Sequence, residues 1–132
     1  MKFLLDTDTC IYAIKKHTAV IEAMNAVDPD DLAVSVVTEA ELRTGAAKSS
    51  SPIKSLHVME IFLQPLTILD FTSENTVVYA HLRAKLERAG TPIGPYDTII
   101  AAQALANDLT LVTNNEREFR RIPGLRVENW RS

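Results

Sequence analysis

The side chains of this sequence that are best suited to chemistry are carboxylates that follow apolar or loop segments. Asp6 and Asp8 come directly after the apolar run Phe3 to Leu5, and Asp97 closely follows a loop rich in glycine and proline. Glu41 lies in a helical pattern after a second apolar run. Because open sheets of parallel strands bind ligands beyond the carboxyl ends of their strands, we expect these acids to meet at one sheet edge.

Carboxylates that meet in this way favour a metal-dependent chemistry. Three of them at one edge would repel one another and raise each other's pKa unless a cation neutralised them. Oxygen ligands alone suit Mg²⁺ or Mn²⁺, and such an ion can activate water and stabilise charge on a phosphodiester under in-line attack. A zinc site or a nucleophile finds no support, because His17, His57 and His81 are dispersed and Cys10 has no patterned partner.

Each of these acids also has a purely structural interpretation. Asp97 could satisfy free amides in the first turn of the helix that follows the glycine- and proline-rich loop. Glu41 could be the partner of Thr38 in a capping box, and Asp8 could be an N-cap. Asp6 is the hardest to explain structurally, because it directly ends the most hydrophobic strand.

These acids require a fold that brings strand ends together, and the hydrophobic pattern predicts one. Short apolar runs bounded by turn residues indicate buried strands, and longer segments with helical spacing indicate helices. We expect strands over residues 2–5, 32–36, 66–69, 109–112 and 125–127. We expect helices over residues 10–17, 18–27 and 53–63, a long helix that is capped by Ser73 and runs to Ala89, and helices beginning at Thr38 and Pro95. This alternation predicts an α/β fold whose parallel central sheet of four to five strands is covered by helices.

Size and composition restrict the class of protein. A chain of 132 residues with 46% hydrophobic and 23% charged residues can bury one core, so we expect a single domain over residues 1–132. No apolar run is long enough for a membrane span, no signal peptide pattern is present, and the lone Cys10 suits a reducing cytosol. We therefore expect a cytoplasmic protein. The net charge of -3 argues against nucleic-acid binding by bulk electrostatics, although arginines gather in residues 114–132.

Four segments, in order and spread over nearly the whole chain, resemble the PIN-domain ribonuclease toxins of the VapC type. They are FLLDTDTCIYAIK (3 to 15), AVSVVTEAELRTGAAKS (33 to 49), GTPIGPYDTIIAAQA (90 to 104) and LVTNNEREFRRIPGLRVENW (111 to 130). Each segment alone is a weak signal, whereas the four in sequence are specific. The resemblance implies a PIN-like three-layer fold with the first strand at the centre of the parallel sheet.

The resemblance also implies an activity, that of a metal-dependent endoribonuclease toxin of a type II toxin–antitoxin pair. Such enzymes use Mg²⁺ or Mn²⁺ to cut structured RNA, often transfer RNA, and so arrest translation and growth. The catalytic and metal-binding acids of the family match Asp6, Glu41 and Asp97, the glutamate being the one followed by Leu42 to Gly45. The implied partners are a VapB-type antitoxin, which inserts a C-terminal segment into the active-site groove, and a second copy of the chain in a homodimer.

Two positions depart from the family pattern. Asp8 stands where many relatives have Asn, and Asn115 stands where many PIN domains supply a fourth acid. If residues 114–120 form a helical turn, Glu118 shares a face with Asn115, so both residues are candidates for the fourth metal position. Candidates for holding RNA phosphates follow the same strand end: Arg117, Arg120 and Arg121.

Two other functions fit part of the sequence. Asp6-x-Asp8 after an apolar strand also resembles the motif of haloacid-dehalogenase-type phosphatases, with Asp6 as nucleophile and Asp8 as general acid. That family's motif continues with Thr or Val where this chain has Cys10, and no lysine motif or late acidic pair follows. The other alternative is a non-catalytic PIN-fold module that binds protein or RNA, which the presence of all three core acids disfavours.

Overall fold

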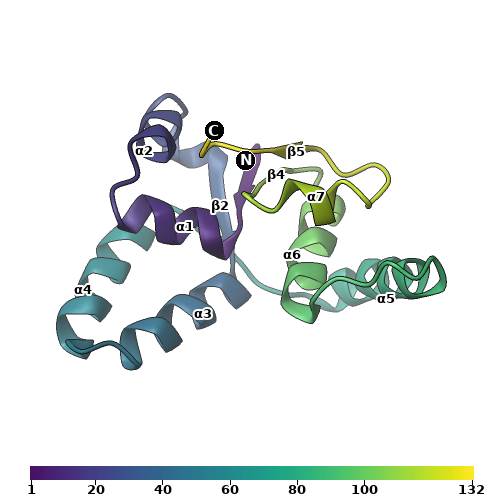
Figure 1. Ribbon diagram of the computed structural model, residues 1–132, viewed down its shortest axis with the longest axis horizontal. Helices are drawn as coiled ribbons and strands as arrows, with labels where there is room; N and C mark the ends of the chain where they lie inside the picture. Colours follow the sequence, from purple (N-terminus) through teal and green to yellow (C-terminus); the bar gives the residue numbers. More distant parts are fainter.

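A five-stranded parallel sheet forms the centre of the computed structural model, which describes residues 1–132 (Figure 1). Its strands lie in the order β3-β2-β1-β4-β5, and every neighbouring pair is parallel. The strands are β1 (Phe3–Leu5), β2 (Leu32–Ser35), β3 (Thr67–Leu69), β4 (Thr110–Val112) and β5 (Val127–Glu128). The predicted α/β fold is therefore confirmed, and β1 is the central strand, as the family resemblance implied.

Seven α-helices connect and cover these strands. They are α1 (Thr7–Ile14), α2 (Thr18–Asn25), α3 (Val36–Ala47), α4 (Pro52–Leu63), α5 (Ser73–Arg88), α6 (Pro95–Ala106) and α7 (Glu116–Phe119). Two helix pairs lie at opposite ends of the molecule, α3 with α4 and α5 with α6 (Figure 1). None of the helices is both long and apolar enough to cross a membrane.

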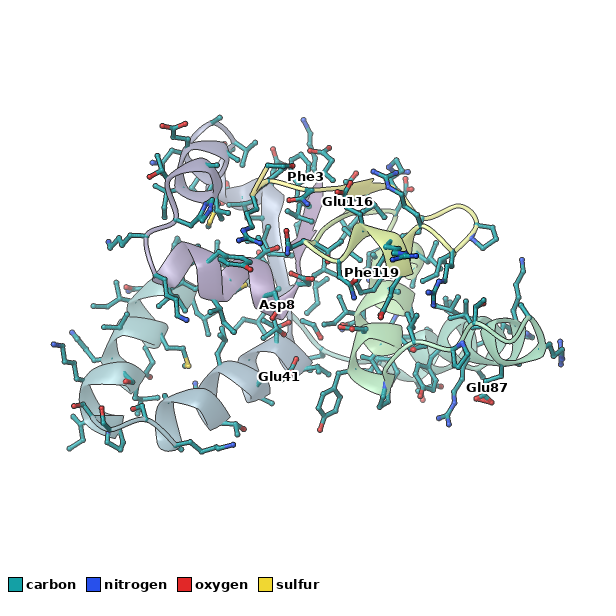
Figure 2. All side chains as sticks on the ribbon, in the orientation of Figure 1. Phe3, Asp8, Glu41, Glu87, Glu116 and Phe119 are labelled. Carbon is teal, nitrogen blue, oxygen red and sulfur yellow. The ribbon has the colours of Figure 1, made fainter.

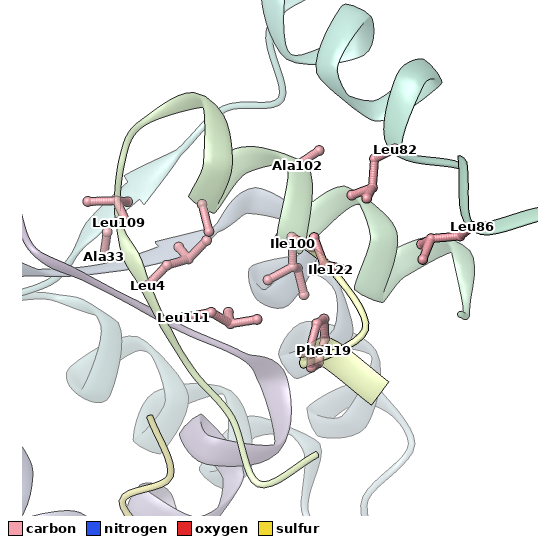
Figure 3. Packing of buried hydrophobic residues seen from close by; sticks show 12 residues of the cluster. Leu4, Ala33, Leu82, Leu86, Ile100, Ala102, Leu109, Leu111, Phe119 and Ile122 are labelled. Carbon is pink, nitrogen blue, oxygen red and sulfur yellow. The ribbon is translucent and has the colours of Figure 1, made fainter. Parts of the chain in front are cut away.

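Each face of the sheet carries its own apolar layer, because successive residues of a strand point to opposite faces. On one face, Leu4 and Leu111 pack with Ile100 of α6 and Phe119 of α7 (Figure 3). On the other face, Leu5 packs in a layer with buried residues of α1, α3 and α4: Cys10, Leu42 and Met59. The sheet and these two helical layers form the three-layer arrangement that the resemblance implied.

The chain changes its direction of progress across the sheet at β1. From β1 it moves outward through β2 and β3 on one side, and it then returns to form β4 and β5 on the other. Such a switch point leaves a crevice beyond the carboxyl ends of the strands, which is the usual ligand site of open parallel sheets. Asp6 directly follows β1, so the fold places this carboxylate at the switch point.

The start of α3 differs from the sequence prediction. The helix begins at Val36, and its N-cap is Ser35, whose hydroxyl accepts a hydrogen bond from the Val37 N–H at 3.0 Å. Thr38 is buried inside the helix, so the predicted capping box of Thr38 with Glu41 is wrong. The error has a local cause, because Val36 and Val37 are β-branched and extend the strand pattern of the preceding residues.

Two other boundaries also move. Thr72 is the N-cap of α5, and its hydroxyl and backbone N–H exchange hydrogen bonds of 3.2 Å with Asn75 in a reciprocal capping box. Ser73 is therefore the first helical residue. The last strand begins at Val127, later than the predicted Leu125, because residues 125 and 126 lead out of the turn that follows α7.

Candidate active site

Asp6 is held at the switch point by contacts with two strands and one helix. Its backbone N–H donates to the Val112 carbonyl of β4 at 3.0 Å. Its carboxylate is the N-cap of α1 and accepts a hydrogen bond from the Thr9 N–H at 2.9 Å. The Thr9 hydroxyl donates in turn to the Val112 carbonyl at 3.2 Å. These bonds fix the orientation of a carboxylate that is only 4% exposed.

The surroundings of Asp6 disfavour its negative charge. Burial raises the pKa of Asp6, and the nearby charge of Asp8 raises it further, whereas hydrogen bonds with Thr113 and Thr9 lower it. The first of these effects is the largest, so the pKa lies above its ordinary value. A cation beside Asp6 would remove this penalty.

Asp97 is the acid whose pKa is raised by the charges of all the other carboxylates of the site. It lies half-buried in the first turn of α6, whose N-cap is Gly94 and whose N-terminus has no side-chain cap. The structural interpretation of Asp97 as a helix cap is therefore not supported. The pKa of Asp97 is raised to about 6, most strongly by burial and further by four negative charges, in decreasing order those of Asp6, Glu118, Glu41 and Asp8.

The carboxylates whose charges raise the pKa of Asp97, together with Asp97 itself, come from four elements. Asp6 and Asp8 come from the start of α1, Glu41 from α3, Asp97 from α6 and Glu118 from α7. Figure 2 shows Asp8 and Glu41 near each other where α1 and α3 meet. The structure thus brings together the three acids predicted from the sequence, and it adds Glu118 to them.

Glu41 is oriented by a short chain of hydroxyl groups. The Thr7 hydroxyl donates to the Glu41 carboxylate at 2.6 Å, and it lies 3.0 Å from the hydroxyl of Thr38. Thr38 is buried one helical turn before Glu41. Because Thr7 directly follows Asp6, one backbone turn sets the positions of two acids. Thr38 therefore contributes to the site through its hydrogen bond with Thr7, and it does not cap α3.

We expect Thr7→Val to lower the activity of the site by about 10-fold or more, because a hydrogen bond to a charged group contributes roughly 1.5–3 kcal/mol. Thr7→Ser should retain the activity, since it keeps the donor. Thr76→Val is a matched control, because the Thr76 hydroxyl bonds only the Ser73 carbonyl on α5. The cleavage rate of each of the three variants, and the metal concentration at which that rate is half-maximal, measure the effect of the hydrogen bond. Equal effects of Val and Ser at position 7 would contradict an orienting role for the Thr7 hydroxyl.

Two residues with different chemistry are the candidates for the fourth metal position. Asn115 is the N-cap residue of α7, but its side chain does not cap the helix, and its backbone N–H donates to the Thr113 hydroxyl at 2.9 Å. Glu118 lies one turn later, half-buried, and its charge acts on Asp97. The helical turn predicted for residues 114–120 exists as α7, and it directs a carboxylate toward the site.

The set of side chains suits a hydrated divalent cation. None of the five acids forms an ion pair with Lys or Arg, since the ion pairs of the molecule use other carboxylates. At the same time, no three His, Cys, Asp or Glu side chains stand where they would enclose one ion together. Mg²⁺ commonly keeps several waters and binds through one or two carboxylates, so uncompensated acids near one point fit it better than a closed cage would.

The three predicted RNA-binding arginines divide into two kinds. Arg120 donates to Glu116 at 2.8 Å across one turn of α7, so its charge is already paired. Arg117 and Arg121 are exposed and form no ion pair. Only these two are free to contact an anionic ligand next to the acidic cluster.

Cys10 does not contribute a nucleophile. The side chain is fully buried in the apolar layer of α1, and burial raises the pKa of its thiol well above the ordinary value. A neutral buried thiol is chemically inert.

The sequence prediction missed the threonines that orient the acids. Four hydroxyl groups surround Asp6 and Glu41, and they belong to Thr7, Thr9, Thr38 and Thr113. The alternation Asp6-Thr7-Asp8-Thr9 was a visible signal, because it places a hydroxyl beside each carboxylate. Thr38 and Thr113 could not be found in this way, since both come from distant parts of the chain.

The chain is similar to known proteins over nearly its whole length. The chain is 43% identical over 130 residues to the tRNA(fMet)-specific endonuclease VapC of Salmonella typhimurium strain LT2, covering 98% of both chains. It is 41% identical to ribonuclease VapC2 of Rickettsia felis, with the same coverage. The crystal structure of DNA-bound VapBC from Salmonella typhimurium has a chain that superimposes with a TM-score of 0.93 at 44% identity, with 98% of each chain covered.

These relatives are ribonucleases, which leaves the phosphatase interpretation of Asp6 and Asp8 without support. The family model of the PIN domain matches residues 3–125, a range that contains all five acids of the site. The chain belongs to the PIN domain family.

Proposed function

We propose that this chain is the ribonuclease toxin of a VapBC-type toxin–antitoxin pair. It hydrolyses phosphodiester bonds in structured RNA, transfer RNA foremost, and so arrests translation and growth. The observation that carries the proposal is the gathering of four carboxylates around Asp97 on a PIN fold related over nearly its whole length to VapC ribonucleases. The absence of ion pairs for these acids supports a cationic cofactor.

Asp6 and Asp97 are the residues that would hold Mg²⁺ or Mn²⁺, with Glu41 and Glu118 beside them. The ion, when bound, would supply a water activated for attack and stabilise charge on the phosphate. Thr9 and Thr113 keep Asp6 in one orientation, and Thr7 does the same for Glu41. Fixing the ligands in advance reduces the reorganisation that metal and substrate binding require.

The proposed partners follow from the relatives. VapBC from Salmonella typhimurium is a complex of a VapC-type chain with VapB, which supports a VapB-type antitoxin for this chain. A homodimer and a cytoplasmic location complete the proposal. Expression with and without any small protein encoded beside this chain tests it: growth arrest and RNA fragments are expected only without such a partner.

A second test separates a ribonuclease from a non-catalytic PIN module. The purified chain should cleave transfer RNA in the presence of Mg²⁺ or Mn²⁺, and a chelator should abolish the cleavage. RNA binding without cleavage, at any tested metal concentration, would favour the binding module instead.

Glu118 should contribute more to metal binding than Asn115 does. An ionised carboxylate is a stronger ligand for Mg²⁺ than one neutral amide oxygen, and it can also act through a metal-bound water. We expect Glu118→Gln to raise the metal concentration needed for half-maximal activity by about 10-fold and Asn115→Ala to change it less. Asn115→Asp should lower it.

Titration of cleavage against Mg²⁺ and Mn²⁺ for these three variants measures the effect. Parent-like behaviour of Glu118→Gln together with an inactive Asn115→Ala would assign the fourth position to Asn115 and return Glu118 to the surface.

Arg117 and Arg121 should hold RNA without taking part in the chemistry. Their joint replacement by Ala is expected to weaken RNA binding and to make its salt dependence shallower, because fewer phosphates are neutralised. The double change Lys85→Ala and Arg88→Ala removes two exposed, unpaired charges from α5 and serves as the control. RNA binding by both double variants is measured at several salt concentrations. If the two variants show the same dependence of affinity on salt, Arg117 and Arg121 do not contact RNA phosphates.

A further inference from the structure

An open pocket lies beside the acidic cluster, between α3 and the start of α6. Its volume is about 310 Å³, and it is lined by Val37, Ala40, Glu41, Thr44 and Tyr96. The four residues from α3 are spaced so that they share one face of the helix. The opposite face of α3 packs into the protein through Thr38, Leu42 and Ala46.

The walls of this pocket are mostly apolar and include one charged group. Val37 and Ala40 carry no polar side-chain atoms, and the Thr44 hydroxyl already donates to the Ala40 carbonyl at 2.9 Å. Tyr96 forms the other wall, and 56% of this residue is exposed, so its ring is accessible to a ligand. The charged group of the lining is the carboxylate of Glu41, which accepts a hydrogen bond from Thr7 and also belongs to the acidic cluster.

These walls fit a flat ring with apolar faces and a polar edge, which describes a nucleobase. Proteins that recognise RNA commonly take an unpaired base out of the stack and place it against an aromatic side chain. A carboxylate at the pocket edge can accept a hydrogen bond from an exocyclic amino group. Tyr96 directly precedes Asp97, so a ring stacked on it would lie next to a phosphate held at the acidic cluster.

We propose that this pocket takes one unpaired nucleobase of the RNA next to the bond that is cut, stacked on Tyr96. The inference rests on the proposed ribonuclease function and assigns a base-binding subsite to it. Tyr96 then acts in substrate binding and specificity, and the acids perform the chemistry. A paired base cannot enter the pocket, so the site selects loops or unpaired ends of a structured RNA.

The test compares Tyr96→Ala with Tyr96→Phe and Tyr96→Trp. Removing an aromatic ring on which a base stacks weakens RNA binding by about 10-fold or more. We expect Tyr96→Ala to raise the KM for transfer RNA by that factor with a smaller change in kcat, and the two aromatic variants to stay near the parent. Val77→Ala, which removes an apolar group that is 59% exposed on α5, is the matched control. Ala40→Leu fills the pocket from the other wall and should act as Tyr96→Ala does.

RNA oligonucleotides that span the cut site and lack a single base identify the base in the pocket. Removal of that one base should weaken binding to the parent by a similar factor and have little further effect on Tyr96→Ala, since both changes delete the same contact. Losses that add for every base, or equal behaviour of Tyr96→Ala and Val77→Ala, would overturn the inference. So would an effect of Tyr96→Ala on antitoxin binding or dimerisation with unchanged RNA kinetics.

The outcomes for the subsite and for the proposed function are distinct. A parent chain that cleaves RNA while Tyr96→Ala cleaves equally well overturns the subsite alone. A parent chain that binds RNA through Tyr96 without cleaving it overturns the ribonuclease function and retains the subsite. A parent chain that does not bind RNA overturns both.

Discussion

Asp6→Asn and Asp97→Asn are each expected to lower RNA cleavage by more than about 100-fold, because even the loss of groups that only orient metal ligands costs roughly 10–100-fold. Asparagine keeps the shape of the side chain and one acceptor oxygen, so it can still cap α1 at position 6. It loses the negative charge that holds a divalent ion. Cleavage of transfer RNA at saturating Mg²⁺ or Mn²⁺ provides the measurement.

Asp8→Asn is the matched control for this pair. Asp8 lies in the same turn as Asp6, but it is exposed, and the carboxylate that caps α1 is that of Asp6. We therefore expect Asp8→Asn to retain most of the activity. The predicted capping role of Asp8 is wrong, because Asp6 fills that position directly after β1. A loss at Asp8 equal to that at Asp6 would revive the phosphatase chemistry, and near-normal cleavage by Asp6→Asn or Asp97→Asn would contradict the metal site.

The metal-free protein is expected to lose stability as the pH rises from about 4 to above 6. The pKa of Asp97 is raised from 3.8 to about 6, so the folded state holds a proton over this interval that the unfolded state has already released. Above pH 6 the folded protein must carry the charge next to four other carboxylates. A shift of about two pKa units corresponds to ~3 kcal/mol for a fully buried group, and we expect about half of that for the partly exposed Asp97.

Urea unfolding at pH 4.5 and pH 7.5 in a chelator measures this difference. Asp97→Asn should remove most of it, and at pH 7.5 this variant should be more stable than the metal-free parent. Saturating Mg²⁺ or Mn²⁺ should stabilise the parent at pH 7.5 and leave Asp97→Asn nearly unchanged, because only the parent binds the ion well. Equal pH dependence in both proteins would show that Asp97 is not the crowded carboxylate.

The sequence was sufficient to predict the strands and the acids that follow them. Asp6 could be placed because it ends an apolar run, and Asp97 because it opens a helix after a glycine- and proline-rich loop. Both positions depend on local patterns, and parallel strands bring their carboxyl ends to one edge. The ion pair between Arg120 and Glu116 could also have been predicted from the sequence, because Glu116 precedes Arg120 by one helical turn.

The orientation of Glu41 could not be predicted, because its partner comes from another helix. Local spacing suggested that Thr38 and Glu41 cap α3, whereas Thr7 of α1 forms the actual hydrogen bond across 34 positions of sequence. The same limit applies to the pocket beside Tyr96, whose walls come from α3 and α6. Contacts between distant segments depend on packing that hydrophobic periodicity does not specify.

The position of β1 at the centre of the sheet determines when a newly made chain can assemble the acidic cluster. Leu5 of the first strand pairs with Val112 of β4, and Thr9 bonds the carbonyl of Val112, which lies 103 positions later. At about 5–20 residues per second, ribosomes need roughly 5–20 s to synthesise that interval. Until β4 leaves the exit tunnel, Asp6 has no strand on one side and Thr113 cannot reach it. We therefore expect chains that end before β4 to lack the hydrogen bonds that position Asp6 in the acidic cluster.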